Sequence, residues 1–234
     1  MYESFMNLPY FQGMSKDEIT SILDKVKLEF FRYEDGELVF AKGSPCEHFA
    51  ILVRGEVVSS CISPDGRYTV LEELAPPIAF EPYSLFGLSP YYRCSYHAKG
   101  SCDVLMIKKS YLFKEFARYD IFLMNMLNLI SQQAQQRSAQ IWNRAEMDIP
   151  HKILDFIVTR TEQPDGCKTI LVKMNVLAGI LGETRINVSR VLNSFQQQGL
   201  AELRRKEIVI PSLKKLKQYV ESCGCNEVLT PDCL

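Results

Sequence analysis

The clearest periodic pattern along the chain is a pair of short helical repeats between Met174 and Leu200. The apolar residues of the first repeat recur at the spacing of one helix face: Val176, Leu177, Ile180 and Leu181. Gly182 then supplies a left-handed break, and Thr184 is of a residue type that caps helix N-termini. The second repeat carries the apolar residues Ile186, Val188, Val191, Leu192 and Phe195. This pattern predicts a helix-turn-helix.

Polar residues at the start of the second helix fall away from its apolar positions, so we expect them to point outward: Thr184, Arg185, Asn187, Ser189 and Arg190. Such a group suits the DNA major groove, because Arg can pair with guanine, Asn with adenine, and Thr and Ser with phosphate. The alternative is an ordinary helical hairpin with a solvated face.

A short basic hairpin is predicted directly after the two helices, over Leu203–Ile210. Arg204, Arg205 and Lys206 are expected at its tip, and the apolar residues that follow form the returning strand. A basic hairpin beside a recognition helix is a wing that can contact backbone phosphates.

Upstream of the helix-turn-helix, the apolar residues change from a helical spacing to an alternating one. A capping box at Ser15–Glu18 begins a short helix, and several short apolar runs then follow from Leu28, separated by Gly-containing turns. Many short strands without long helices between them indicate a β-roll or barrel. The proline-rich stretch Pro76–Pro82 interrupts the strands, and we interpret it either as a wall of a ligand pocket or as a plain surface connection.

A long helix is predicted from Asp120 to Glu146. Its apolar seam alternates steps of four and three residues through Leu123, Leu127, Ile130, Ala134, Arg137 and Ile141. A helix of this length, about 40 Å, extends beyond one roll, so its expected partner is a second copy of itself.

The long helix is expected to end at Met147–Pro150, with Asp148 as the N-cap of the next helix and as a hinge. That next helix, Pro150–Thr161, is predicted to bury Ile153, Leu154, Ile157 and Val158, and a strand at Thr169–Val172 leads into the helix-turn-helix. In this interpretation Met147–Pro150 is the only link between the two parts of the chain.

Charge is distributed unevenly between these parts. Residues 168–221 hold ten Lys or Arg against four Asp or Glu, a net charge of +6, whereas residues 1–147 hold fifteen against eighteen, a net charge of −3. The overall net charge of −1 therefore hides a basic C-terminal part, as duplex DNA requires. No apolar run approaches the roughly 20 residues of a membrane span, and no signal peptide is recognisable, so we expect a soluble, cytoplasmic protein.

The eight cysteines fall into two groups. Five are scattered and are expected to be reduced: Cys46, Cys61, Cys94, Cys102 and Cys167. The tail carries Cys223, Cys225 and Cys233, which suit a metal site, an iron–sulfur cluster or a redox switch, or else a frayed tail that bears thiols.

In this order, the elements resemble the CRP/FNR superfamily of bacterial transcription regulators. The resemblance rests on FAILVRGEV in the roll, MDIPHKILDFI at the hinge and LAGILGETRINVSRVLNSFQQQGLAEL in the helix-turn-helix. It implies an α+β fold with a cyclic-nucleotide-binding-like β-roll, a long dimerisation helix and a winged helix-turn-helix. The implied domains are an effector-sensing roll at 1–119, the dimerisation helix at 120–147, the DNA-binding domain at 148–221 and a Cys-containing tail at 222–234.

The resemblance also implies roles for single residues. Arg185 and Arg190 match the recognition-helix arginines of the family, and Ser189 matches a serine of its FNR-like members, while Ile186 replaces the usual glutamate and can touch a thymine methyl. Glu81 and Arg93 are the residues that match the effector-binding Glu and Arg of cyclic-nucleotide-binding members. The accompanying glycine is missing, so we expect an effector other than cyclic AMP.

Haem is a further possibility within this family, with His48, His97, His151 and Met147 as candidate axial ligands, and an iron–sulfur cluster is a weaker one. The favoured function is a homodimeric regulator that binds palindromic duplex DNA and, if it activates transcription, RNA polymerase. The alternative is an effector-binding or interaction protein whose helix-turn-helix only packs or dimerises. No nucleophile–base pair, phosphate loop or HExxH signature indicates an enzyme.

Overall fold

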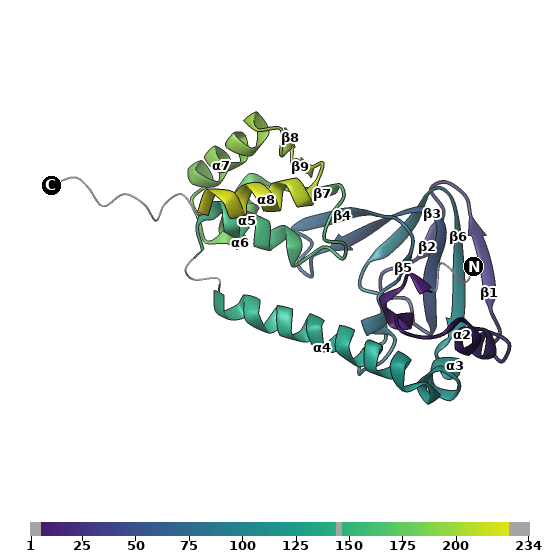
Figure 1. Cartoon of the computed structure of the whole chain (residues 1–234). Helices are drawn as coiled ribbons and strands as arrows, with labels where there is room; N and C mark the ends of the chain where they lie inside the picture. Colours follow the sequence, from purple (N-terminus) through teal and green to yellow (C-terminus); the bar gives the residue numbers. More distant parts are fainter. Residues whose placement is uncertain (1–5, 144–146, 225–234) are drawn as a thin grey trace. The chain divides into compact units, whose positions relative to one another are not determined.

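The computed structural model describes residues 6–143 and 147–224, and the chain divides into two compact units (Figure 1). The first, called the roll unit here, comprises Met1–Ser59 and Leu74–Ala139. The second, called the reader unit, comprises Ser60–Glu73 and Gln140–Leu234. The predicted class is confirmed: an antiparallel sheet domain is followed by helices and a C-terminal helix-turn-helix. Across the described residues, no helix combines the length and apolar character needed to span a bilayer.

The roll unit is built around strands of very different lengths. These strands are β1 (Glu29–Tyr33), β2 (Leu38–Phe40), β3 (His48–Ile62), β5 (Ile78–Ala79) and β6 (Ser95–Lys108). β6 pairs antiparallel with β1, from Glu29 opposite Met106 to Tyr33 opposite Cys102, and it also pairs with β2. Only glycine fits at position 55 of β3, because a Cβ there would lie 2.3 Å from the Ser101 carbonyl oxygen. The close approach of β3 and β6 therefore depends on Gly55.

Helices flank the strands of the roll unit. They are η1 (Pro9–Phe11), α2 (Lys16–Leu23), η2 (Pro82–Ser84), α3 (Lys109–Lys114), η3 (Phe116–Arg118) and α4 (Asp120–Asn143). The predicted capping box is confirmed, since Ser15 Oγ accepts from the Glu18 N–H at 3.2 Å and the Glu18 carboxylate accepts from the Ser15 N–H at 2.7 Å. Glu81, which precedes η2, is one of the two non-glycine residues with positive φ among those described.

The long helix α4 has two different faces. Phe122 and Met126 are buried, and the Phe122 ring lies 5.4 Å from that of Phe11. Asn125 adds hydrogen bonds from its side chain to the carbonyl oxygens of Tyr10 and Gln12. The apolar residues around the predicted seam are exposed instead: Ile121, Leu123, Met124, Leu127 and Ile130. The outer part of the seam, from Arg137 to Glu146, falls where side chains or backbone lie outside the described residues.

The reader unit holds the predicted winged helix-turn-helix. Its elements are α5 (Ile149–Val158), β7 (Lys168–Val172), α6 (Met174–Leu181), α7 (Arg185–Gln197), β8 (Glu202–Arg204), β9 (Glu207–Ile210) and α8 (Leu213–Gly224). One apolar core joins them, with Ile157, Leu192, Ile210 and Leu216 at 0% exposure. The predicted burial of Val158 is wrong, since Val158 is 40% exposed and α5 ends there rather than at Thr161. Phe156, on the opposite side of the turn, is buried instead.

A strand from the first half of the chain completes the sheet of the reader unit. β4 (Tyr68–Leu74) pairs antiparallel with β7, from Tyr68 opposite Val172 to Glu72 opposite Lys168. β7 pairs in turn with β9, and β9 with β8. The chain thus leaves the roll unit twice, once at residues 60–73 and once through α4. The interpretation of Met147–Pro150 as the only link is therefore wrong, because strand pairing brought in a distant segment.

An ion pair buried within the reader unit fixes the end of this pairing. Glu72 and Lys168 are 2% and 0% exposed, and Lys168 Nζ lies 2.6 Å from Glu72 Oε1. The Glu72 carboxylate also accepts from the backbone N–H groups of Glu162 and Gln163, both at 2.7 Å. Lys168 Nζ donates further to the Asp165 carbonyl oxygen at 2.6 Å. These hydrogen bonds satisfy the two buried charges, as burial of an ion pair requires.

Lys168→Met is expected to lower the free energy of unfolding of the reader unit by about 3–5 kcal/mol, because it leaves the buried Glu72 carboxylate without its cation. Lys217→Met is the matched control in the same unit: Lys217 Nζ lies 3.9 Å from Glu221 Oε1, its side chain is 57% exposed, and such a pair is worth about 0–1 kcal/mol. Urea unfolding followed by circular dichroism measures both effects. Equal losses in the two variants would contradict the role given to the buried pair.

Candidate nucleic-acid interface

The turn between α6 and α7 has the predicted geometry. Gly182 is left-handed, with φ +69°, and the N–H of Glu183 donates to the Ala178 carbonyl oxygen at 2.9 Å, which closes α6 in a Schellman-type turn. Thr184 then caps α7, since its hydroxyl accepts from the Asn187 N–H at 3.3 Å. The predicted left-handed break and N-cap are both confirmed.

A second ion pair joins this turn to α5. Lys152 Nζ lies 2.6 Å from Glu183 Oε1, and both side chains are about one-fifth exposed, at 20% and 21%. Because residues of α5 also belong to the core of the unit, α5 and the helix-turn-helix form one body. A movement of α5 is therefore transmitted to α7.

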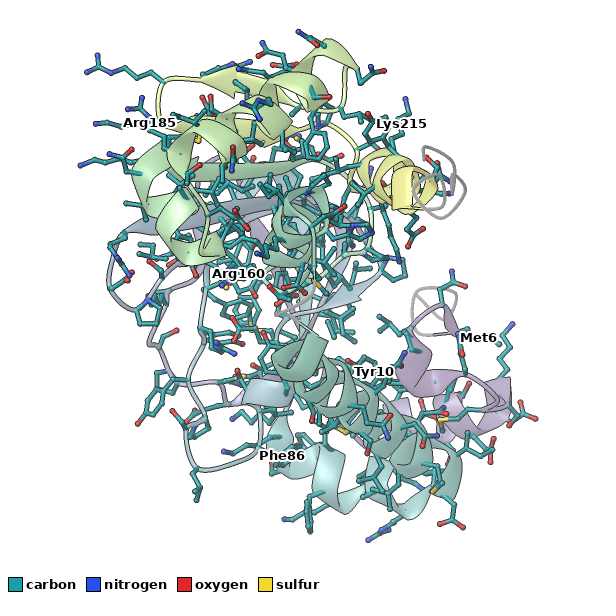
Figure 2. The ribbon with its side chains drawn as sticks, turned by 90° about the vertical axis from the view of Figure 1, so that its left-hand side faces the viewer. Met6, Tyr10, Phe86, Arg160, Arg185 and Lys215 are labelled. Atoms are coloured by element: carbon teal, nitrogen blue, oxygen red, sulfur yellow. The ribbon has the colours of Figure 1, made fainter. Side chains whose placement is uncertain are left out.

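The outward face of α7 is a shallow hollow in the reader unit. Its lining residues are Arg185, Ile186, Ser189, Arg190, Asn193, Ser194 and Gln197. Figure 2 shows Arg185 at the periphery of the unit, whereas Lys215 of α8 lies at its other side. Part of the positive charge of the reader unit is therefore away from this face.

The hollow includes residues that the sequence pattern assigned differently. Ile186 was predicted on the apolar side of the helix, yet it is 71% exposed and lies between Arg185 and Arg190 on the outward face. Asn193 and Gln197 were not singled out at all. In the sequence, Asn193 and Gln197 continue the four-residue spacing that begins with Arg185 and Ser189. This spacing keeps all four residues on one side of a helix.

Two predicted DNA-binding residues lie beside the hollow rather than in it. Thr184 is exposed and its hydroxyl oxygen is engaged by the cap, while Asn187 is half-buried one turn into the helix. The Thr184 hydroxyl still has its proton to donate, which suits a phosphate contact more than a base contact.

The wing is a tight hairpin of β8 and β9. Arg204 is the last residue of β8, and its guanidinium lies 2.9 Å from Glu202 and 3.8 Å from Glu207. Arg205 and Lys206 form the turn, where Lys206 has a left-handed backbone with φ +63°. The tip thus consists of Arg205 and Lys206, and Arg204 is held on the strands beneath it.

Asp148, the predicted hinge residue, caps the N-terminus of α5 as expected. The Asp148 carboxylate accepts from the His151 N–H at 2.9 Å, and the same oxygen lies 2.6 Å from His151 Nδ1. Pro150 stands in the first turn of α5, where its missing N–H leaves no hydrogen bond unmade. His151, a candidate haem ligand, is therefore engaged with the capping residue Asp148.

The predicted effector residues belong to the roll unit. Glu81 is 0% exposed, and its carboxylate accepts from the backbone N–H groups of Arg93 and Cys94. Arg93 itself is exposed. The structure brings the two residues together through the backbone of Arg93, and their effector role stays a prediction.

Cysteine chemistry differs from the expectation at two positions. Cys46, Cys102 and Cys167 are not in disulfide bonds, and burial raises the pKa of the Cys46 thiol to about 11, which favours its protonated form. Cys61 and Cys94 are disulfide-bonded, so the prediction that they are reduced is wrong in this structure. Cys225 and Cys233 lie outside the described residues, as does the side chain of Cys223. Among the described side chains, no three His, Cys, Asp or Glu gather as a metal site.

Two family models match the chain, in the order of its two parts. The cyclic nucleotide-binding domain model matches residues 30–119, and the Crp-like helix-turn-helix domain model matches residues 151–219. Together they cover nearly all of the roll strands, most of α5, the helix-turn-helix and the wing.

Curated proteins and solved structures agree with these matches. The cAMP-activated global transcriptional regulator Vfr of Pseudomonas aeruginosa is 23% identical over 188 residues, which cover 76% of this chain and 87% of Vfr. The global nitrogen regulator of Synechococcus elongatus is 26% identical over 195 residues, which cover 80% and 87%. The crystal structure of the sensor domain of the transcriptional regulator DNR from Pseudomonas aeruginosa has a TM-score of 0.51 at 18% identity, covering 60% of this chain and 93% of that domain, and it shows the fold. With a cyclic-nucleotide-binding-like domain followed by a Crp-like reader, the chain belongs to the CRP/FNR superfamily of bacterial DNA-binding transcription regulators.

Proposed function

We propose that the chain acts as a homodimer that binds a palindromic operator and changes its DNA affinity when the roll unit receives an effector other than cyclic AMP. The observation that carries the DNA-binding part is the outward face of α7, where two arginines flank an exposed isoleucine within the basic stretch 168–221. An operator-binding assay tests it, because specific binding with a steep salt dependence requires both base and phosphate contacts.

Base reading is assigned to Arg185, Ile186, Ser189 and Arg190. An arginine can take the O6 and N7 atoms of guanine, and an isoleucine can contact only the methyl group of thymine. Since Ile186 accepts no hydrogen bond, the operator should carry thymine where an acidic side chain would select cytosine. Arg204, Arg205, Lys206 and Thr184 are assigned to the phosphates, and Asn187 to the edge of the reading face.

Dimerisation is assigned to the exposed face of α4. Leu123, Leu127 and Ile130 are 40%, 51% and 41% exposed, although they follow the spacing of a helix–helix seam. An apolar stripe on one side of a helix of 24 residues, about 36 Å long, is best covered by the same stripe of a second copy. Two readers related by a two-fold axis then match half-sites about one helical turn of DNA apart.

Transmission of the effector signal from the roll to the DNA-binding helices is assigned to a hinge at Asp148. Its cap begins α5, and α5 is bound to the helix-turn-helix through Lys152 and Glu183, so a change in the cap rotates the whole reader body. An N-cap is worth about 1 kcal/mol, within reach of a typical allosteric coupling energy. RNA polymerase is the further partner if the output is activation, and haem with a gas ligand or a redox signal are the candidate effectors, neither preferred over the other.

Arg185→Ala is expected to cost about 1–3 kcal/mol on one base pair of the operator and to relax the selection of that base, because a bidentate contact is lost. Arg205→Ala, the matched control at the wing tip, should weaken specific and random duplexes alike and lower the salt slope by about 1. Footprinting and anisotropy titrations against both duplexes measure this. The same loss of selectivity in the two variants would refute the assignment.

Ile130→Asp is expected to give monomers that bind the operator much more weakly, because two-fold symmetry brings the new carboxylates close together in an apolar seam. Asn128→Asp adds the same charge to an exposed residue on the other side of α4 and should leave the dimer intact. Light scattering of both variants gives the mass. An Ile130→Asp variant with the mass of the parent would rule out this seam.

Asp148→Leu is expected to change operator affinity about fivefold, because it removes an N-cap worth about 1 kcal/mol and favours an unbroken helix. Asp148→Asn keeps a side-chain acceptor of equal capping strength and should bind DNA as the parent does. Anisotropy titration with one operator compares the three proteins. The hinge lies elsewhere if the leucine variant and the parent have the same affinity.

A further inference from the structure

A buried carboxylate lies in the roll unit, between the strand β5 and the short helix η2. Glu81 is 0% exposed, and its backbone is left-handed, with φ +38° and ψ +56°. A non-glycine residue adopts this conformation at a cost, so the surrounding structure must hold it there. The contacts of the Glu81 side chain supply that hold.

Four donors converge on the two oxygens of the Glu81 carboxylate. The Arg93 N–H donates to Oε2 at 2.8 Å and lies 3.0 Å from Oε1, and the Cys94 N–H donates to Oε1 at 2.9 Å. The hydroxyls of Ser84 and Tyr96 lie 2.8 Å from Oε2 and 3.1 Å from Oε1. A carboxylate has about four lone-pair positions, so these donors use its full capacity.

These donors make an anion cradle from neutral groups. Two consecutive backbone N–H groups that face one point form a concave site for a negative charge. Each hydroxyl adds a dipole, and Ser84 and Tyr96 are both buried, at 5% and 0% exposure. The cradle would suit a carboxylate or a phosphate oxygen from any source, and here the source is the chain itself.

Aromatic rings close the space around the cradle. The Phe40 and Tyr92 rings stack with their centroids 4.4 Å apart, and the Phe80 ring lies 5.0 Å from Tyr96. Phe80, Tyr92 and Tyr96 are 1%, 3% and 0% exposed. The segment that supplies the N–H donors is therefore packed on one side and bound to Glu81 on the other.

We propose that Glu81 is a tethered anionic ligand of the roll, which occupies this cradle and closes it to free carboxylates and phosphates, including the phosphate of a cyclic nucleotide. The inference deepens the proposed function and rests on it in taking the roll as the sensor. A tethered group has a high effective concentration and gives up no translational freedom on binding, so a free anion with the same contacts cannot compete. Glu81 then holds the 93–96 segment in place without an effector, instead of contacting one.

The test uses the full chain, with Glu81→Ala to empty the cradle and Glu81→Gln to fill it without a charge. The probes are sodium acetate, inorganic phosphate and cyclic AMP, each compared with sodium chloride at matched ionic strength. Glu81→Ala is expected to lower Tm by roughly 5–10 °C, since buried donors lose their acceptor, and acetate should restore part of that loss in a saturable way. Glu81→Gln and the parent should respond to acetate no more than to chloride.

The parent chain gives a second measurement that does not depend on a variant folding. The amide resonances of Arg93 and Cys94 should not move when phosphate or cyclic AMP is added to the parent. Saturable shifts at these amides would overturn the inference, as would a folded Glu81→Ala variant on which acetate and chloride act alike. Operator binding by the parent is measured in the same samples, and its absence would refute the proposed function while leaving the result on the cradle unaffected.

Discussion

The reader unit depends on a strand that it borrows from the first half of the chain. Without β4, the outer edge of β7 would present unpaired N–H and C=O groups, which proteins normally cover or blunt. Glu72 and Lys168 lie opposite each other at the end of that pairing, and neither is accessible to water. Removing the segment would take away the carboxylate that pairs with Lys168 and leave this edge of β7 unpaired, so residues 60–73 contribute to the stability of the winged helix-turn-helix.

Two features of the reader unit differ in how easily they can change, the cap at Asp148 and the β4–β7 pairing. The cap at Asp148 is exposed, involves one side chain and is worth about 1 kcal/mol, so a signal of ordinary size can change it. The β4–β7 pairing joins five residues on each strand and includes a buried ion pair whose disruption costs about 3–5 kcal/mol. We infer that the hinge is the adjustable connection, and that β4 remains docked while the hinge changes.

The sequence could predict the features that rest on neighbouring residues. The capping box at Ser15, the left-handed Gly182 and the caps at Thr184 and Asp148 each depend on contacts within about one helical turn. It could not predict the β4–β7 pairing, since Glu72 and Lys168 are 96 residues apart and β4 reads as any other strand of the roll. Ile186 was misassigned for a related reason: an apolar residue in the first turn of a helix fits the period of the core even when it faces outward.

Glu81 shows why a matching residue type does not define a matching site. In sequence it is an acidic residue near an arginine, as an effector site of this family requires, but its environment decides its chemistry. Its carboxylate meets two neutral N–H groups and two hydroxyls, and the Arg93 contact runs through the backbone while that residue is exposed. The acceptor capacity of the Glu81 carboxylate is filled, and aromatic rings pack beside it. The carboxylate therefore has no lone pair left for a ligand hydroxyl. An effector of the kind proposed for this roll would therefore need contacts other than the Glu81 carboxylate, whose environment in the structure is that of a buried structural ligand of the 93–96 segment.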